Sequence, residues 1–134
     1  MTDHVPVERL AKLAAEVLNS AYAPYSRFRV GAALEAESGE VFTGCNVENA
    51  SYGLTICAER AALAAAVARG HAGFRRLVVA TEGDRAVAPC GACRQVLAEF
   101  GTGLEVFSVA KKESLRWSLE DLIPSVFKLA VTDE

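Results

Sequence analysis

The stretches Cys57-Ala58-Glu59-Arg60 and Pro89-Cys90-Gly91-Ala92-Cys93 hold three of the chain's four cysteines. Cys90 and Cys93 are three positions apart at the start of a predicted helix, so their sulfur atoms can converge on one ion, with Cys57 as the third ligand. A structural zinc site has four protein ligands, whereas a catalytic site keeps one position open for water. Glu59 is a hard oxygen donor and is better suited to take a proton from that water than to bind zinc. The two stretches therefore predict one catalytic zinc ion per chain.

Each of these stretches begins a predicted helix. Residues 57–69 are rich in alanine, which favours a helix and permits close packing, and Gly70 ends it. Residues 91–100 form the second of these helices, which stops at Gly101. A helix N-terminus carries roughly half a positive charge. Two such termini would offset the single negative charge that three thiolates leave on a zinc dication, and would lower the thiol pKa values.

The rest of the chain alternates between helical and strand patterns. Residues 7–20 have apolar side chains at helical spacing, and residues 28–34 and 41–47 read as a hairpin around Ser38-Gly39. Alternation along the second strand would put Asn46 and Glu48 on one face. The remaining expected elements are strands at 77–80, 104–109 and 115–117 and a short helix from residue 118.

This order of elements predicts a layered α/β domain with a mixed sheet, because helices separated by strands pack on sheet faces. The length of 134 residues suits a single domain covering residues 1–134. Hydrophobic residues make up 51% of this short chain, which hints at further burial between subunits.

Charge and hydropathy exclude several classes of partner. The formal net charge is -3 and no run of Lys or Arg exceeds two residues, so we expect no nucleic-acid binding. No apolar stretch is long enough to span a bilayer, and the N-terminus has no signal-peptide pattern, so we expect no membrane association. The four cysteines are therefore expected to be reduced thiols in the cytoplasm, more suited to a metal than to disulfides.

The chain resembles the small homotetrameric cytidine deaminases that act on free nucleosides, along nearly its whole length. A Cys-Ala-Glu stretch followed by Pro-Cys-x-x-Cys is typical of zinc deaminases, in which the glutamate is not a ligand. The resemblance implies a three-layer α/β/α sandwich around a mixed five-stranded sheet and a role in pyrimidine salvage. The stretches that carry it are 23–28 (APYSRF), 30–34 (VGAAL), 44–52 (GCNVENASY), 57–60 (CAER) and 89–95 (PCGACRQ).

The resemblance also assigns roles around the metal. It implies that Cys57, Cys90 and Cys93 bind Zn²⁺ and that Glu59 moves protons in the hydrolytic deamination of cytidine and deoxycytidine. Such a glutamate takes a proton from water, gives it to ring N3 and later protonates the leaving amino group. Arg60 matches an arginine that hydrogen-bonds the thiolates.

Further matches concern the nucleoside and the neighbouring subunits. Asn46 and Glu48 match residues that bind the ribose 3′-hydroxyl, Phe28 an aromatic that packs on the pyrimidine, and the Ala58 backbone a contact to the base. Tyr52 and Phe127 match residues that reach a neighbouring subunit's site in the homotetramer. Lys128-Leu129 follow Phe127 where the family commonly has Gly-Pro.

Other interpretations remain open from the residues alone. The cysteines could be buried structural thiols or form a closed four-cysteine site that includes Cys45. Asn46 and Glu48 could be polar residues of an exposed strand, Arg60 a surface arginine, and Phe28 and Phe127 core residues. The same site could also serve another aminopyrimidine nucleoside or a nucleoside-like antibiotic, or a zinc-stabilised binding module without turnover.

Overall fold

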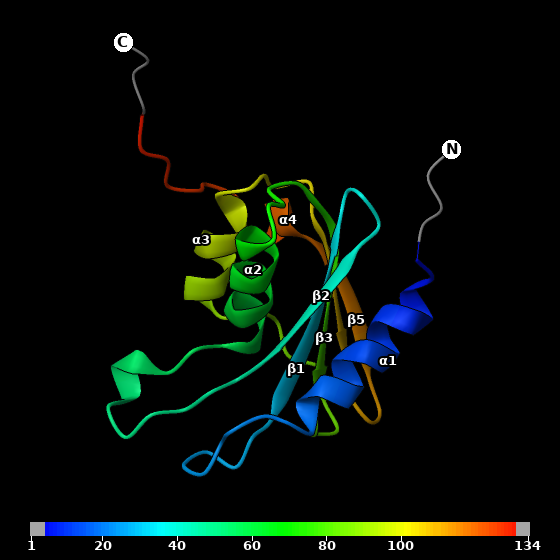
Figure 1. Ribbon diagram of the computed structural model, residues 1–134, viewed down its shortest axis with the longest axis vertical. Helices are drawn as coiled ribbons and strands as arrows, with labels where there is room; N and C mark the ends of the chain where they lie inside the picture. Colours follow the sequence, from blue (N-terminus) through cyan, green and yellow to red (C-terminus); the bar gives the residue numbers. More distant parts are fainter. Residues whose placement is uncertain (1–4, 131–134) are drawn as a thin grey trace.

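The computed structural model describes residues 5–130, and its centre is a five-stranded mixed sheet with strand order β2-β1-β3-β4-β5 (Figure 1). Strands β3 and β4 are parallel, and the other neighbouring pairs are antiparallel. In chain order the elements are α1 (Val7–Leu18), β1 (Val30–Ala36), β2 (Val41–Cys45), the 3₁₀ turn η1 (Tyr52–Leu54), α2 (Ala58–Ala68), β3 (Phe74–Thr81), α3 (Gly91–Ala98), β4 (Glu105–Val109), β5 (Ser114–Ser118) and α4 (Leu119–Leu122).

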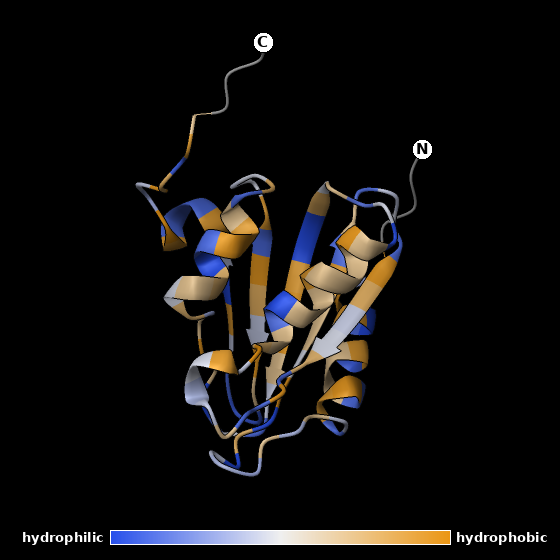
Figure 2. Cartoon of the chain, turned by 60° about the vertical axis from the view of Figure 1, so that its left-hand side comes forward, coloured by the Kyte–Doolittle hydropathy of each residue, from blue (hydrophilic) through white to orange (hydrophobic). Residues whose placement is uncertain are grey.

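Helices cover both faces of the sheet, which confirms the predicted α/β sandwich. Figure 1 shows α1 on one side and α2, α3 and α4 on the other. One apolar cluster joins Leu10 and Ala14 of α1 to Val78 of β3, and a larger cluster joins Leu63 of α2 to Val79 of β3. Successive residues of a strand point to opposite faces. Strand β3 is therefore buried on both faces, and Figure 2 shows long hydrophobic stretches in the strands.

The hairpin strands are displaced from their predicted positions. The first was predicted over residues 28–34 but begins two residues later, because side chains from elsewhere in the chain hold residues 25–29 in a turn. The second was predicted to reach residue 47 but ends at Cys45. Val47 leaves the strand and makes single bridges to Tyr22 and Ile56 instead. Asn46 and Glu48 therefore lie just beyond the strand.

The helix that carries Glu59 packs directly on β2 at Gly44. A methyl group at Gly44 would meet the Ala58 carbonyl oxygen at 2.7 Å and the Ala61 carbonyl carbon at 2.9 Å. Both atoms belong to the backbone of α2, so the helix would have to move. The absence of a side chain at Gly44 thus sets the position of α2 relative to the sheet.

We expect Gly44→Ala to lower the free energy of unfolding by ~1–3 kcal/mol, the usual cost of overpacking. Urea denaturation followed by circular dichroism would measure it. Gly103→Ala is the matched control, since within residues 5–130 no atom other than those of its chain neighbours lies within 4 Å of the added methyl group. Equal stability of the two variants would contradict this account of the β2–α2 contact.

None of the helices within residues 5–130 has both the length and the apolar composition that crossing a bilayer requires.

Candidate active site

The sulfur atoms of Cys57, Cys90 and Cys93 lie within 4.8 Å of one another. Cys57 and Cys90 are the N-cap residues of α2 and α3, and Cys93 lies in the first turn of α3. The Cys57 and Cys90 sulfurs are 3.9 Å apart. Two thiolates bound to one tetrahedral zinc at 2.3 Å would be about 3.8 Å apart. The spacing of the three cysteines therefore fits one zinc ion, and thiolate sulfur is among the ligands that zinc favours.

Cys45 does not belong to this cluster. Within the described part of the chain, the residues grouped closely enough to hold a metal are the other three cysteines. Cys45 is half-buried at the end of β2. A closed site of four cysteines is therefore not formed, and one coordination position of a tetrahedral ion would remain for water.

The electrostatic setting of the cluster favours thiolate. The pKa of Cys57 is lowered to about 5, first because the Cys93 thiol hydrogen-bonds it and then because of Arg60. The pKa of Cys93 is raised, since it donates to Cys57 and is buried. These contacts thus favour a thiolate at Cys57, and a bound dication would favour removal of the remaining thiol protons.

Arg60 lies against the cluster from the first turn of α2. Its Nη2 donates to the Cys57 sulfur and to the Thr55 carbonyl oxygen, both at 3.4 Å. Its buried Nε has no hydrogen-bond partner among residues 5–130. A guanidinium with an unused donor beside three sulfurs suits a centre that carries net negative charge.

Glu59 is buried beside the cysteines, with 6% of its surface exposed. Burial is the largest cause that raises the pKa of its carboxyl, and the Cys57 charge raises it further. A carboxyl with a raised pKa exchanges protons more readily near neutral pH, which general acid–base catalysis requires. Glu59 is thus placed and tuned as a proton carrier beside the metal ligands.

A small cavity of about 180 Å³ lies over these groups. It is reached from the carboxyl end of β3, where the loop of residues 82–90 leads to Cys90. Active sites of open α/β sheets commonly lie at the carboxyl ends of parallel strands. The residues that line the cavity are Val30, Asn46, Thr55, Cys57, Ala58, Glu59, Val79, Val87, Ala88 and Cys90.

A second cavity of about 420 Å³ is lined by Tyr25, Ser26, Glu48, Tyr52 and Thr55. Thr55 lines both cavities, so the inner cavity at the cysteines and the outer cavity are neighbours. The inner cavity is mostly apolar apart from Asn46, Glu59 and the thiols, whereas the outer cavity has a carboxylate and aromatic rings. The two together offer a narrow inner site and a wider outer site.

Asn46 and Glu48 both contact the turn of residues 25–30. The Asn46 Nδ2 donates to the Phe28 carbonyl oxygen, and its Oδ1 accepts from the Val30 N–H, each at 2.9 Å. Glu48 Oε1 accepts the N–H of Tyr25. The interpretation as polar residues of an exposed strand is therefore wrong for Asn46, which is 8% exposed.

The three aromatic candidates differ in their position relative to the two cavities. Tyr52 borders the outer cavity, packs edge-to-face on Tyr25 and is 75% exposed. Phe28 is 37% exposed and is not among the residues that line either cavity, and a methyl group added at Gly83 would be 3.8 Å from its ring. Phe127 lies apart from both cavities, with 70% of its surface exposed and its carbonyl oxygen accepting from Gln95 Nε2. None of the three is a core residue.

Thr55 and Val87 could not be singled out from the sequence, because neither belongs to a metal-binding or catalytic pattern. Ser26 carried a weak signal, because a serine hydroxyl in a turn often accepts the backbone N–H of the residue two positions later. Its hydroxyl does accept the Phe28 N–H, at 3.0 Å.

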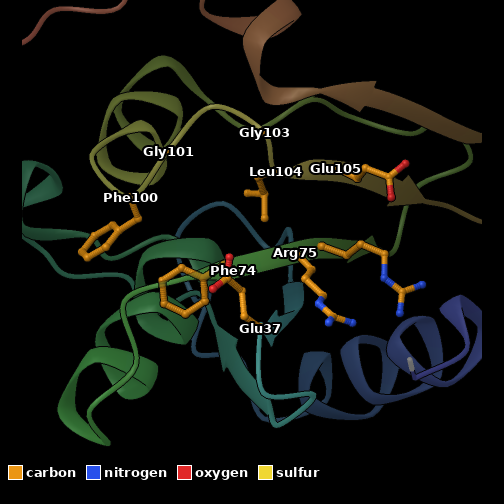
Figure 3. Close-up of a pocket in the computed structure, with 9 residues that line it drawn as sticks. Glu37, Phe74, Arg75, Phe100, Gly101, Gly103, Leu104 and Glu105 are labelled. Atoms are coloured by element: carbon orange, nitrogen blue, oxygen red, sulfur yellow. The ribbon is translucent and has the colours of Figure 1, made fainter. Parts of the chain in front are cut away.

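A further cavity, of about 660 Å³, lies at the opposite end of the sheet, at the amino ends of β3 and β4 (Figure 3). Figure 3 shows Phe74 and Phe100 on one side of it and Arg75 and Glu105 on another. Among the described residues 5–130, no cysteine or histidine lines it. It therefore has no part in the chemistry of the cysteine cluster.

Residues 5–109 match the family model described as "Cytidine and deoxycytidylate deaminase zinc-binding region". The chain is 44% identical over 128 residues to a cytidine deaminase of Sporosarcina psychrophila, which covers 87% of this chain and 94% of that protein. It is 49% identical over 108 residues to a probable cytidine deaminase of Dictyostelium discoideum, covering 80% and 74%.

The fold also matches solved structures. The crystal structure of a cytidine deaminase from Burkholderia pseudomallei superposes with a TM-score of 0.88 at 46% identity, covering 92% of this chain and all of that one. The family model spans most of the chain, including Glu59 and the three clustered cysteines. This chain therefore belongs to the zinc-binding family of cytidine and deoxycytidylate deaminases.

Proposed function

We propose that this chain catalyses the zinc-dependent hydrolytic deamination of cytidine and deoxycytidine to uridine and deoxyuridine, with release of ammonia. The observation that carries the proposal is the set of three thiols around one point beside buried Glu59, inside a cavity open to one side. Membership of the deaminase family and relatives with the name cytidine deaminase support the same reaction.

Cys57, Cys90 and Cys93 hold the zinc in this proposal. Zinc supplies Lewis acidity that lowers the pKa of water from about 15.7 to about 7. Two helix N-termini and Arg60 counter the negative charge of the three thiolates, which would otherwise weaken that acidity.

Glu59 carries protons between water and substrate. Its carboxylate takes a proton from the attacking water and delivers it to ring N3. It then takes the proton of the new hydroxyl at carbon 4 and gives it to the amino group, which leaves as ammonia while the carbon 4 carbonyl forms. Both protonation states occur within one cycle, and the raised pKa of Glu59 makes them closer in free energy at neutral pH. Burial of the carboxyl also keeps bulk water away from the proton transfers.

The base occupies the inner cavity and the sugar the outer one. The Ala58 backbone contacts the base, Phe28 packs on the base, and Asn46 and Glu48 bind the sugar hydroxyl. Neither cavity is lined by a lysine or arginine among the described residues, while Glu48 lines the outer one. A neutral nucleoside suits this lining better than a negatively charged nucleotide.

An ammonia-release assay on cytidine, deoxycytidine, cytosine, cytidine monophosphate and a nucleoside-like aminopyrimidine antibiotic tests the proposal. We expect turnover of both nucleosides and poor use of cytosine and the monophosphate. Turnover confined to a nucleoside-like antibiotic would favour a different aminopyrimidine substrate. No ammonia from any compound, by protein that retains zinc, would favour a binding module.

The active unit is proposed to be a homotetramer with shared sites. Apolar side chains around the outer cavity remain exposed in the single chain, including Tyr52 at 75% and Leu54 at 67%. Phe127 is similarly uncovered, and the outward face of α2 has small exposed residues such as Ala64 and Ala65. A neighbouring chain that covers them would enclose the nucleoside, with Tyr52 and Phe127 reaching across.

We expect light scattering of dilute protein to give about four times the 14.2 kDa chain mass, with activity at the same concentration. Phe127→Ala should raise the KM for cytidine, because a truncated wall contributes less contact. An active monomer would contradict shared sites. A tetramer in which Phe127→Ala leaves KM unchanged would remove the role of Phe127 alone.

The cytoplasm is the proposed location and pyrimidine salvage the proposed role. Three free cysteines must stay reduced to bind zinc, and the cytosol keeps thiols reduced.

A further inference from the structure

The Ser26 hydroxyl joins a carboxylate that lines the outer cavity, that of Glu48, to the backbone of Phe28. It donates a hydrogen bond to Glu48 Oε2 and accepts one from the Phe28 N–H at 3.0 Å. Ser26 lines the outer cavity together with Glu48. One hydroxyl is thus bound at the same time to the carboxylate and to the backbone that carries Phe28.

Ser26 leaves the Glu48 carboxylate with a single free direction. An ionised carboxylate has about four acceptor positions. Oε1 accepts the Tyr25 N–H at 2.9 Å and the Ser26 N–H at 3.1 Å, and Oε2 accepts the Ser26 hydroxyl. About one acceptor lone pair therefore remains, on Oε2. The hydrogen bond from the Ser26 hydroxyl sets the direction of that lone pair. The same hydrogen bond is the largest cause that lowers the pKa of Glu48, so the carboxylate stays charged.

The turn that follows Ser26 depends on the same hydroxyl. Arg27 has φ of 58°, a left-handed conformation that is uncommon outside glycine. The bond from the Phe28 N–H to Ser26 closes the turn over Arg27. Asn46 holds the Phe28 carbonyl oxygen at 2.9 Å, so Phe28 is fixed through both of its backbone polar groups.

We propose that Ser26 is a positioning residue that aims the free lone pair of Glu48 at the 3′-hydroxyl of the nucleoside. The proposal rests on the proposed cytidine deaminase function and names how that site selects a sugar. A hydroxyl at the 3′ position donates to Oε2, while Ser26 keeps Oε2 from rotating away. Ser26 itself touches no reacting atom, so its effect is on binding and not on the chemical step.

The test is steady-state kinetics of Ser26→Ala on cytidine and on 3′-deoxycytidine, which lacks the hydroxyl in question. We expect KM for cytidine to rise about tenfold with kcat within about twofold, the pattern of a lost binding interaction. KM for 3′-deoxycytidine should change less than about threefold. Ser26→Thr keeps the hydroxyl on an exposed residue and should restore the parental KM.

Ser38→Ala is the matched control. Ser38 also accepts an N–H two residues later, that of Glu40 at 3.2 Å, but in the β1–β2 turn. Its kinetics should equal those of the parent. An equal rise of KM for both nucleosides, a fall in kcat alone, or failure of Ser26→Thr to restore KM would overturn the proposal. Absence of ammonia release by the parent protein would instead reject the proposed function itself.

Discussion

Replacement of Glu59 by glutamine is expected to lower kcat for cytidine by at least ~10²-fold, the lower end for loss of general acid–base catalysis. The amide keeps the shape of the side chain but cannot take a proton from water. Glu59 is not among the clustered thiols, so bound zinc should be unchanged. Steady-state ammonia release and metal analysis of the same preparation would measure both effects.

Glu8→Gln is the matched control for this experiment. Glu8 is the second residue of α1, as Glu59 is of α2, so both acids lie at the same place in a helix dipole. Glu8 is exposed and far along the chain from the cysteines. We expect its variant to keep parental kcat. Near-parental turnover by Glu59→Gln would show that Glu59 is only a helix-start acid.

Cys57→Ala should weaken zinc binding and abolish turnover. Loss of an outer partner of a metal ligand already costs about 10–100-fold in affinity or activity, and loss of a ligand should cost more. Cys57 also carries the thiolate that Arg60 contacts at 3.4 Å. Competition with a chelator of known affinity would measure the change in zinc binding.

Cys45→Ala provides the comparison, because Cys45 is a free cysteine outside the cluster. It should bind one zinc per chain as tightly as the parent and retain turnover. A loss of zinc in Cys45→Ala equal to that in Cys57→Ala would mean that the site has four cysteine ligands after all.

Local sequence signals predicted the helices around the site well. Helix α2 begins after its N-cap Cys57 and ends before Gly70, which has a φ of 91°. These limits are nearly those that the alanine-rich pattern predicted. The first hairpin strand was misplaced because its start depends on distant residues. Asn46 and Glu48 hold the turn before Val30 through hydrogen bonds across 16 to 23 positions. The hydrophobic periodicity of a few neighbouring residues cannot predict hydrogen bonds to residues so far away in the sequence.

The chemical part of the site was predictable, and its shape was not. Zinc needs particular ligands at particular spacing, so Cys57, Cys90 and Cys93 are recognisable in one dimension. Thr55 lines both cavities only because η1 and the N-terminus of α2 bring it there. The link from Ser26 to Glu48 likewise arises from folding across 22 positions.

Zinc loading followed by ammonia release from cytidine shows whether turnover depends on a metal held by the three clustered cysteines. Protein freed of metal by a chelator is given zinc in steps, and bound metal and ammonia are measured at each step. We expect no turnover by metal-free protein and a linear rise that ends at about one zinc per chain, as one site of three thiolates implies. Full ammonia release by the metal-free protein would contradict the account.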